Sequence, residues 1–414
     1  MIQKENNFDV AVIGGGPAGL IAAGRAGELG KKVALLEKNE KLGRKLLLTG
    51  AGRCNITNAE FDLRKLVANY GRNGRFLFHA FSLFGPKEVI KFFQDQGLKT
   101  KTERGQRVFP ESDKAMDVLK TLTQYLAKSQ VTTLYNSKVV KVVSRNHQIQ
   151  KLILKEGEIS AKNYIFCTGG KSYPGTGSTG DGLEWARELG HTIEDLFPVL
   201  VPIKTRESWT KELQGLSLKN VEIKVFQKDK IKASRFGECL FTHFGLSGPI
   251  ILDLSKEIGQ LLKTGQVRMS LDLKPALDFQ TLDSRLQRDF KKYQNKSFKN
   301  GLGDLLPRKM ISIFIKLSGV DPEKKINVIT KEERLNLVRL LKNLEITAIG
   351  LLDFDEAIAT SGGVALSEID DKTMRSKIIS NLFFAGEMID IDGPTGGFNL
   401  QVCWSTGRLA GENA

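Results

Sequence analysis

Three glycines near the N-terminus have the spacing with which a polypeptide backbone approaches a dinucleotide pyrophosphate. Gly14, Gly16 and Gly19 follow an apolar run at residues 8–13, which predicts a buried parallel strand. The first glycine permits a tight turn, the second allows close backbone approach, and the third lets a helix pack on the strand. That helix is predicted over residues 18–29, with its N-terminal N–H groups toward the phosphates.

A carboxylate stands where the ribose of such a dinucleotide would lie. Residues 32–36 predict a second strand, and Glu37 follows it directly. A carboxylate at this point can accept hydrogen bonds from both ribose hydroxyls and would repel a 2′-phosphate. The N-terminal region therefore predicts a dinucleotide other than NADP.

A second glycine-rich region lies near the C-terminus, at residues 381–387 and 393–399. Its last residues, from Gly396 to Asn399, open a final predicted helix, whose N–H groups and dipole can stabilise an anion. Between the two ends, a predicted strand at residues 163–167 runs into Thr168, and glycines crowd residues 175–182. Because both chain ends can enclose one cofactor, the pattern favours a flavin over a transient nicotinamide.

Composition restricts the class of protein. The 414 residues carry 62 Lys+Arg against 47 Asp+Glu, a formal net charge of +15. This excess favours a polyanionic partner, nucleic acid first, although lysine on solvated faces would give the same total. The four cysteines have no C-x-x-C spacing, which indicates reduced thiols in a cytoplasm and no metal or disulfide framework. No apolar stretch predicts a membrane span or a signal peptide.

The order of patterns predicts an α/β fold with a split nucleotide-binding domain. Strand, helix and glycine signals fill residues 1–195 and return over 357–414. Short alternating runs predict a β-rich inserted domain at 196–274 and 345–356, and a polar helical pattern predicts a small helical subdomain at 275–344.

Six segments, in order along the chain, resemble one family. They are GRKLLLTGAGRCNITN (43–58), TGGKSYPGTGSTGDG (168–182), GECLFTHFGLSGP (237–249), TSGGV (360–364), TMRSK (373–377) and the stretch 386–407. Together they resemble the BaiN/YhiN-like flavoproteins, also called the aminoacetone-oxidase family. The resemblance implies an FAD-dependent oxidoreductase with a Rossmann-like two-dinucleotide-binding FAD domain, interrupted by a β-rich domain and a small helical one.

The resemblance also implies which residues contact the cofactor. Arg44 and Lys45 would neutralise pyrophosphate charge, and the loop through Gly52, Arg53, Cys54 and Asn55 would lie against the flavin ring. Further contacts are expected at Pro17, Ala18, Lys38, Val139, Thr168, Gly169, Gly170, Asp181, Gly386, Glu387, Gly396, Gly397, Phe398 and Asn399.

Four residues are candidates for catalysis. Cys54 and His243 are the candidate proton donors, although the sequence favours a small packing residue for Cys54 and a histidine bonded to local backbone for His243. Arg375 and Lys377 could hold an anionic substrate or lie on a surface face. No second nucleotide motif follows a strand, so NAD(P)H is expected only as a transient electron donor.

The substrate remains open among three hypotheses. Members of the resembling family are linked to amine oxidation, bile-acid reduction and dihydrouridine formation in ribosomal RNA. Residues 283–316 carry nine Lys or Arg against three Asp, with Tyr293 and Phe298 between them, a pattern typical of a phosphate-contacting face. The leading hypothesis is reduction of a uracil C5=C6 bond in ribosomal RNA. The rivals are a small-molecule amine oxidase or enone reductase, and a non-catalytic flavin-containing RNA assembly factor.

Overall fold

The computed structural model describes residues 7–414, which divide into two compact units. The first unit contains the residues up to 198 together with 354–414, and the second contains residues 199–353. The expected boundaries, 195/196 and 356/357, lie within three residues of these. The helical segment, which the sequence set apart at 275–344, belongs to the same unit as the barrel strands.

The core of the first unit is a parallel sheet with the strand order β6-β2-β1-β9, in which β18 also pairs with β9. Its central strands are almost wholly buried, which explains their unbroken apolar sequences. An antiparallel pair, β8 and β7, extends the sheet beyond β9. The strands are β1 (Asn7–Ile13), β2 (Val33–Leu36), β6 (Thr132–Leu134), β7 (Val139–Arg145), β8 (Gln148–Leu154), β9 (Glu158–Phe166) and β18 (Leu382–Phe384).

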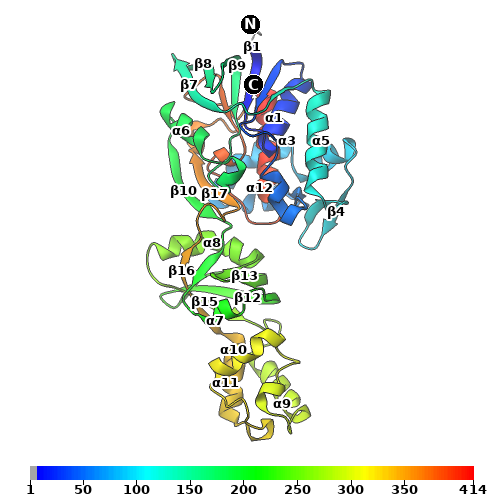
Figure 1. The fold of residues 1–414 in the computed structure, drawn as a ribbon, viewed down its shortest axis with the longest axis vertical. Helices are drawn as coiled ribbons and strands as arrows, with labels where there is room; N and C mark the ends of the chain where they lie inside the picture. Colours follow the sequence, from blue (N-terminus) through cyan, green and yellow to red (C-terminus); the bar gives the residue numbers. More distant parts are fainter. Residues whose placement is uncertain (1–6) are drawn as a thin grey trace. The chain divides into compact units, whose positions relative to one another are not determined.

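Three helices cover this sheet, and α1 packs against both of the others (Figure 1). They are α1 (Pro17–Glu28), α5 (Ala115–Lys128) and α12 (Phe398–Asn413). Close packing of α1 and α12 depends on two glycines: a Cβ on Gly407 would stand 2.4 Å from the Ala18 carbonyl oxygen, and one on Gly411 would stand 2.3 Å from that of Ala22. The backbones of α1 and α12, the first and last α-helices of the chain, are therefore in direct contact.

Smaller elements complete the first unit. A three-stranded antiparallel sheet has the order β3-β5-β4, and β10 pairs with β17. The strands are β3 (Thr57–Asn58), β4 (Thr100–Glu103), β5 (Arg107–Pro110), β10 (Ile193–Val199) and β17 (Ala359–Val364). The helices are α2 (Leu63–Ala68), α3 (Phe78–Leu83), α4 (Pro86–Asp95) and α6 (Asp181–Glu188), with 3₁₀ turns η1 (Leu46–Gly52), η2 (Gly71–Leu77), η3 (Pro174–Thr176), η6 (Leu366–Glu368) and η7 (Gly386–Met388).

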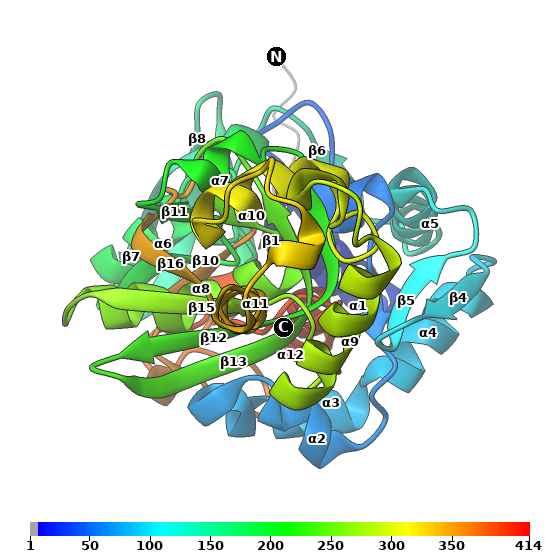
Figure 2. The same cartoon turned by 90° about the horizontal axis from the view of Figure 1, so that it is seen from below.

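The second unit is built on a closed antiparallel barrel with the strand order β11-β14-β13-β12-β15-β16. Figure 2 shows β12, β13 and β15 side by side. The strands are β11 (Ile203–Thr205), β12 (Ser217–Gln227), β13 (Lys230–Phe241), β14 (Gly245–Ser247), β15 (Val267–Asp272) and β16 (Leu344–Leu351). Closure removes the free sheet edges that short strands would otherwise expose.

Helices accompany the barrel. The expected helical segment forms α9 (Phe279–Lys292), α10 (Arg308–Ser318) and α11 (Lys331–Lys342), with 3₁₀ turns η4 (Phe298–Asn300) and η5 (Ile326–Val328), and α7 (Trp209–Glu212) is a single turn. Helix α8 (Pro249–Leu262) was not predicted from the sequence, and it buries Ile250, Ile251, Leu254 and Ile258. A proline at its first position and this apolar spacing were available as signals. None of the helices between residues 7 and 414 combines the length and apolar character needed to cross a bilayer.

Candidate functional site

A cleft in the first unit opens where the parallel strands β1, β2, β9 and β18 end. In open α/β sheets ligands bind at these carboxyl ends. The cleft collects residues from most of the chain, including Gly14, Gly16, Pro17, Ala18, Glu37, Lys38, Arg44, Lys45, Val139, Thr168, Gly169, Asp181 and Glu387. Thirteen of the residues expected to contact a cofactor therefore line one cavity.

The glycines at the end of β1 keep this cleft open. Gly14 has φ +107°, and a Cβ there would stand 2.5 Å from the carbonyl oxygen of Cys167. A Cβ on Gly19 would stand 1.9 Å from the Gly14 carbonyl oxygen, so α1 can lie this close to the end of β1 only because residue 19 has no side chain. Gly16, the cap of α1, faces open space instead. The helix N-terminus is thus left clear for an anion.

Glu37 is held rigidly at the end of β2 and is buried. One carboxylate oxygen accepts the N–H of Gly15 at 2.9 Å. The other accepts the backbone and side-chain N–H groups of Asn39, both at 2.8 Å. The carboxylate that the sequence assigned to a ribose is therefore oriented in advance by the glycine turn itself.

Cations lie along the rim of the cleft. Lys38 forms an ion pair with Asp181 at 3.0 Å and donates to the Thr179 hydroxyl at 2.6 Å. The guanidinium of Arg44 donates to the side chain of Asn39 at 3.0 Å. These bonds tie the segment after β2 to the glycine loop that precedes α6, so both sides of the rim are fixed.

A polar network forms a further wall of the cleft. The Lys45 ammonium contacts Glu387 and the Ser172 hydroxyl, each at 2.7 Å. The other oxygen of Glu387 accepts the Ser172 hydroxyl and the Thr360 N–H, each at 2.8 Å. Gly170 lies beside this network, where a Cβ would stand 2.4 Å from the Thr360 hydroxyl.

The turn after Lys45 has an unusual backbone. Gly50, Ala51, Gly52 and Cys54 all have φ between +56° and +84°, a region that costs residues with a side chain about 1 kcal/mol or more each. Asn55, at the end of this turn, is buried, and its side-chain oxygen has no hydrogen-bond partner in the described structure. Strain and an unsatisfied acceptor in one turn indicate a ligand-contacting segment.

The C-terminal glycine loop adjoins the strand that follows this turn. Asn58 donates to the Gly396 carbonyl at 3.2 Å, and a Cβ on Gly397 would stand 2.4 Å from the carbonyl carbon of Thr57. Asn399 holds the loop closed by bonds to both backbone groups of Gly393. Residues from the two chain ends therefore lie together, with Gly397 capping α12 ahead of Phe398.

These features fit FAD. A glycine turn at a helix N-terminus suits the pyrophosphate, the oriented Glu37 suits a ribose, and the strained turn leaves Asn55 with an acceptor for a ring N–H. Gly19, Gly52, Cys54, Asn55, Gly170, Gly386 and the loop at 396–399 do not line the cleft itself, and Arg53 is engaged elsewhere, in ion pairs with Glu103 and Asp113.

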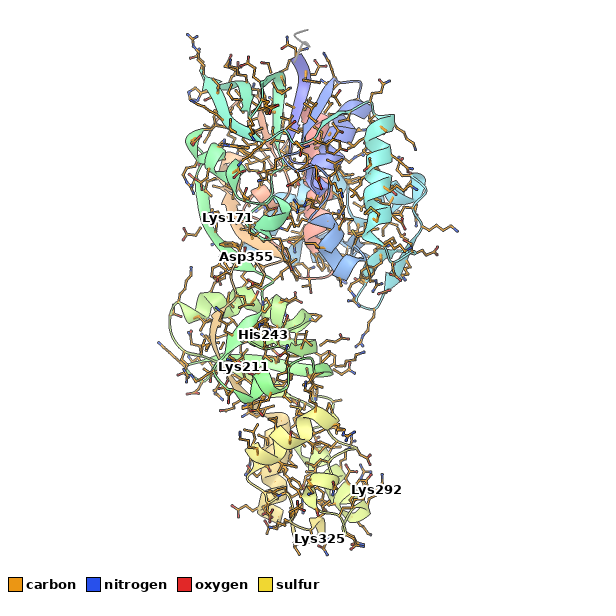
Figure 3. All side chains as sticks on the ribbon, viewed as in Figure 1. Lys171, Lys211, His243, Lys292, Lys325 and Asp355 are labelled. Atoms are coloured by element: carbon orange, nitrogen blue, oxygen red, sulfur yellow. The ribbon has the colours of Figure 1, made fainter. Side chains whose placement is uncertain are left out.

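The catalytic candidates lie in three different environments. Cys54 is fully buried, and burial raises the pKa of its thiol to about 12. His243 is exposed between β13 and β14 of the second unit, where Figure 3 labels it, with its ring 4.7 Å from that of Phe244. Arg375 stacks over Phe383 at 5.1 Å, and Lys377 donates to the Ser367 carbonyl at 2.9 Å. None of the four lines the cleft.

Sequence reasoning missed several residues of the cleft. Gly15, Asn39, Ser137, Lys138, Thr176, Gly177, Ser178, Thr179, Trp185, Ala385 and Cys403 also line it. The dense glycines of residues 175–182 did signal close approach, and Ala385 follows β18 as Cys167 follows β9. Nothing in the sequence marks Cys403, which reaches the cleft only because α12 packs on α1. No group of three potential ligands among residues 7–414 could hold a metal ion.

Comparison with known proteins identifies a family and several relatives. The family described as HI0933-like protein Rossmann domain matches residues 8–413. The chain is 31% identical to a ribosomal RNA dihydrouridine synthase of Haemophilus influenzae, covering 98% of this chain and 97% of that protein. It is 29% identical to a 3-dehydro-bile acid delta(4,6)-reductase of Clostridium scindens, covering 98% of each.

Among solved structures, a flavocytochrome c3 fumarate reductase has the same fold. The TM-score is 0.53 at 16% identity, over 99% of this chain and 78% of that one. This likeness extends over both units and establishes the architecture, a Rossmann-type nucleotide domain with an inserted unit.

Proposed function

The chain belongs to the HI0933-like Rossmann family of FAD-dependent oxidoreductases, and we propose that its substrate is a uracil of ribosomal RNA, reduced to dihydrouridine. FAD, when bound, supplies two electrons as a hydride. The reaction adds that hydride to C6 and a proton to C5, so the C5=C6 double bond becomes single. An external reductant of the NAD(P)H class has to return the two electrons after each turnover.

The cationic surface of the helical segment is the observation that carries this proposal. Arg288, Lys291, Lys296, Arg308 and Lys316 are exposed, and none has a carboxylate partner in the described structure. Tyr293 lies between Lys292 and Lys296, whose ammonium groups are 4.7 and 4.5 Å from its ring centre. Exposed cations near an aromatic ring suit phosphates and bases, although Lys292 also pairs with Asp304, whereas a small neutral substrate needs no such surface. Figure 3 shows Lys292 on this segment.

The residues of the cleft would hold the cofactor and leave the substrate to other groups. The N-terminus of α1 and Lys45 would face the pyrophosphate, and Glu37 would face a ribose. The proton for C5 has to come from a group that substrate can reach. Cys54 is fully buried even before a cofactor covers its loop, which argues against this thiol as the donor.

The test is anaerobic single-turnover oxidation of the reduced holoprotein. Two acceptors are compared, ribosomal RNA from cells lacking the gene and a 3-oxo-Δ4 steroid, and buffer alone is the control. We expect rapid flavin reoxidation by RNA only, with a mass gain of two hydrogens at one uridine. Fast reoxidation by the steroid alone would make the protein a small-molecule enone reductase. RNA binding without reoxidation would make it a non-catalytic assembly factor.

A further inference from the structure

A second cationic surface lies in the first unit. It is formed by α2, η2 and α3, which pack against one another. Six side chains are exposed there: Phe61, Arg64, Lys65, Arg72, Arg75 and Phe78. The two phenylalanines are 62% and 47% exposed, and neither belongs to the buried core. We call these six residues the α2–α3 surface.

The two acidic residues of this segment offset only part of the charge of its four cations. Between residues 60 and 83 there are two acids, Glu60 and Asp62. Asp62 caps α2 by accepting the N–H groups of Arg64 and Lys65, and Glu60 accepts the N–H of Asp62. Both carboxylates are therefore bonded to backbone. Neither arginine of η2 has an ion-pair partner in the described structure, so the surface is positively charged.

The same segment is fastened to the C-terminal glycine loop. The Tyr70 hydroxyl, between α2 and η2, donates to the Phe398 carbonyl at 2.9 Å, and its ring lies so close to Gly393 that a Cβ there would be 2.8 Å away. The Asn73 amide donates to the backbone and side-chain oxygens of Asp390 at 2.7 and 2.9 Å. A ligand on the α2–α3 surface is thus separated from the loop at 390–398 by one layer of residues.

We propose that the α2–α3 surface binds single-stranded RNA next to the reacting nucleotide. Phe61 and Phe78 would stack with unpaired bases, and the four cations would contact phosphates. The inference rests on the proposed function, since it supposes an RNA substrate. It adds a contact on the flavin unit itself, where the base must come to react.

Charge separates this occupant from the obvious competitor, a second copy of the chain. In a two-fold dimer the same patch faces itself, so four cations would meet four cations. Such a pairing is repulsive, whereas a polyanion is attracted. The exposed aromatic rings within this cationic patch also suit RNA, because every base offers a face on which a ring can stack.

Binding of a fluorescent single-stranded RNA to the holoprotein tests the surface. The variants are Phe61→Ala with Phe78→Ala, and Arg72→Glu with Arg75→Glu. The matched control is Lys120→Glu with Lys141→Glu, which reverses two exposed charges elsewhere in the same unit. Removing the rings should weaken binding roughly tenfold or more at every salt concentration, because stacking is not screened. Charge reversal should lower the log–log salt slope by about 1.4, at roughly 0.7 per phosphate contact on a single strand.

FAD content and melting temperature should stay at parental values in all three variants, and the control should bind RNA like the parent. Equal RNA binding by the parent and both test variants would refute RNA binding at the α2–α3 surface. It would not contradict the proposal that the substrate is RNA. RNA binding through this surface without dihydrouridine formation would overturn the proposed function alone. A dimer in light scattering that the phenylalanine variant dissociates, with RNA binding unchanged, would identify a second copy as the occupant and refute the inference.

Discussion

Lys45 and Glu387 lie 342 residues apart in the chain and form an ion pair of 2.7 Å in the wall of the cleft. Each side chain is 19% exposed, so the pair is only partly screened by water. The pair joins the segment after β2 to the segment after β18, and it sets the charge balance of the cavity. A dinucleotide pyrophosphate carries negative charge into this cavity, where Lys45 is the cation that offsets Glu387.

Removal of the lysine should therefore affect FAD more than removal of the glutamate. Lys45→Met leaves an uncompensated carboxylate beside the anionic ligand, and we expect the FAD dissociation constant to rise about tenfold or more. Glu387→Gln keeps an acceptor for the Thr360 N–H and should cost less. The double variant should bind FAD better than Lys45→Met alone. Fluorescence titration of apoprotein measures all three, and simple additivity of the two single changes would contradict the coupling.

How far the sequence predicted the structure is clear from particular elements. Gly14, Glu37 and Thr168 lie at strand ends, where parallel-sheet geometry requires them to meet, so the site could be predicted from local patterns. The Lys45–Glu387 pair could not, because its partners follow β2 and β18, which enter one sheet only through long-range pairing with β1 and β9. Helix α8 was missed within a β-rich stretch, where short strand signals surround it.

The buried amide of Asn55 offers a prediction with opposite effects on stability and on binding. Its side-chain oxygen has no partner in the described structure, so Asn55→Leu should leave apoprotein stability unchanged or raise it by about 1 kcal/mol. The same change should weaken FAD binding and shift the flavin absorption bands, because a ring N–H loses its acceptor. Calorimetry of apo and holo forms measures both quantities. A variant with parental flavin spectrum and affinity would show that this acceptor serves another group.

Adjacent glycines at the start of α12 should respond differently to alanine. At Gly397, with φ +99°, a new Cβ would stand 2.4 Å from the Thr57 backbone, so both strain and a clash oppose substitution. At Gly396, with φ +111°, the nearest atoms are 3.5 Å away and only strain applies. We expect Gly396→Ala to cost about 1–2 kcal/mol of unfolding free energy and Gly397→Ala clearly more. Chemical denaturation of apoprotein tests this order, and equal losses would contradict the clash.

His191 links stability to pH through a buried contact. Its ring nitrogens lie 3.2 Å from a Glu368 oxygen and 3.0 Å from the Ser376 hydroxyl. Burial lowers the pKa of His191 below its ordinary value of 6.5, against the opposing pull of Glu368. Although its own partial burial acts in the opposite direction, hydrogen bonds from Thr192 and His191 keep the pKa of Glu368 below its ordinary 4.5.

Both shifts favour the folded state at neutral pH. Because folded His191 binds a proton less readily than the unfolded chain does, its contribution is complete above pH 6.5 and declines as pH falls below that value. The contribution of Glu368 is lost only below about pH 4.5. We expect unfolding free energy to fall between pH 6.5 and 5 by at most about 1.4 kcal/mol per pH unit from this histidine. His191→Asn should flatten that decline, and an unchanged profile would exclude His191 as its origin.

The two unit-2 cations Lys291 and Lys292 should behave differently despite being neighbours. Lys292 pairs with Asp304 at 2.8 Å, whereas Lys291, like Arg288, is exposed and has no carboxylate partner among residues 7–414. Reversing Arg288 and Lys291 to Glu should leave FAD content and thermal stability nearly unchanged, because unpaired surface charges contribute little. RNA binding should weaken, with a salt slope lower by about 1.4–1.8 for two lost phosphate contacts. Dihydrouridine formation should fall in parallel, while oxidation of the reduced flavin by a small acceptor should continue at the parental rate.

Lys292→Glu is the informative comparison, since it also sets a new carboxylate against Asp304 and should lower stability as well as RNA affinity. If the double reversal binds and modifies ribosomal RNA like the parent, this face is only solvated, and a small-molecule substrate becomes the better proposal.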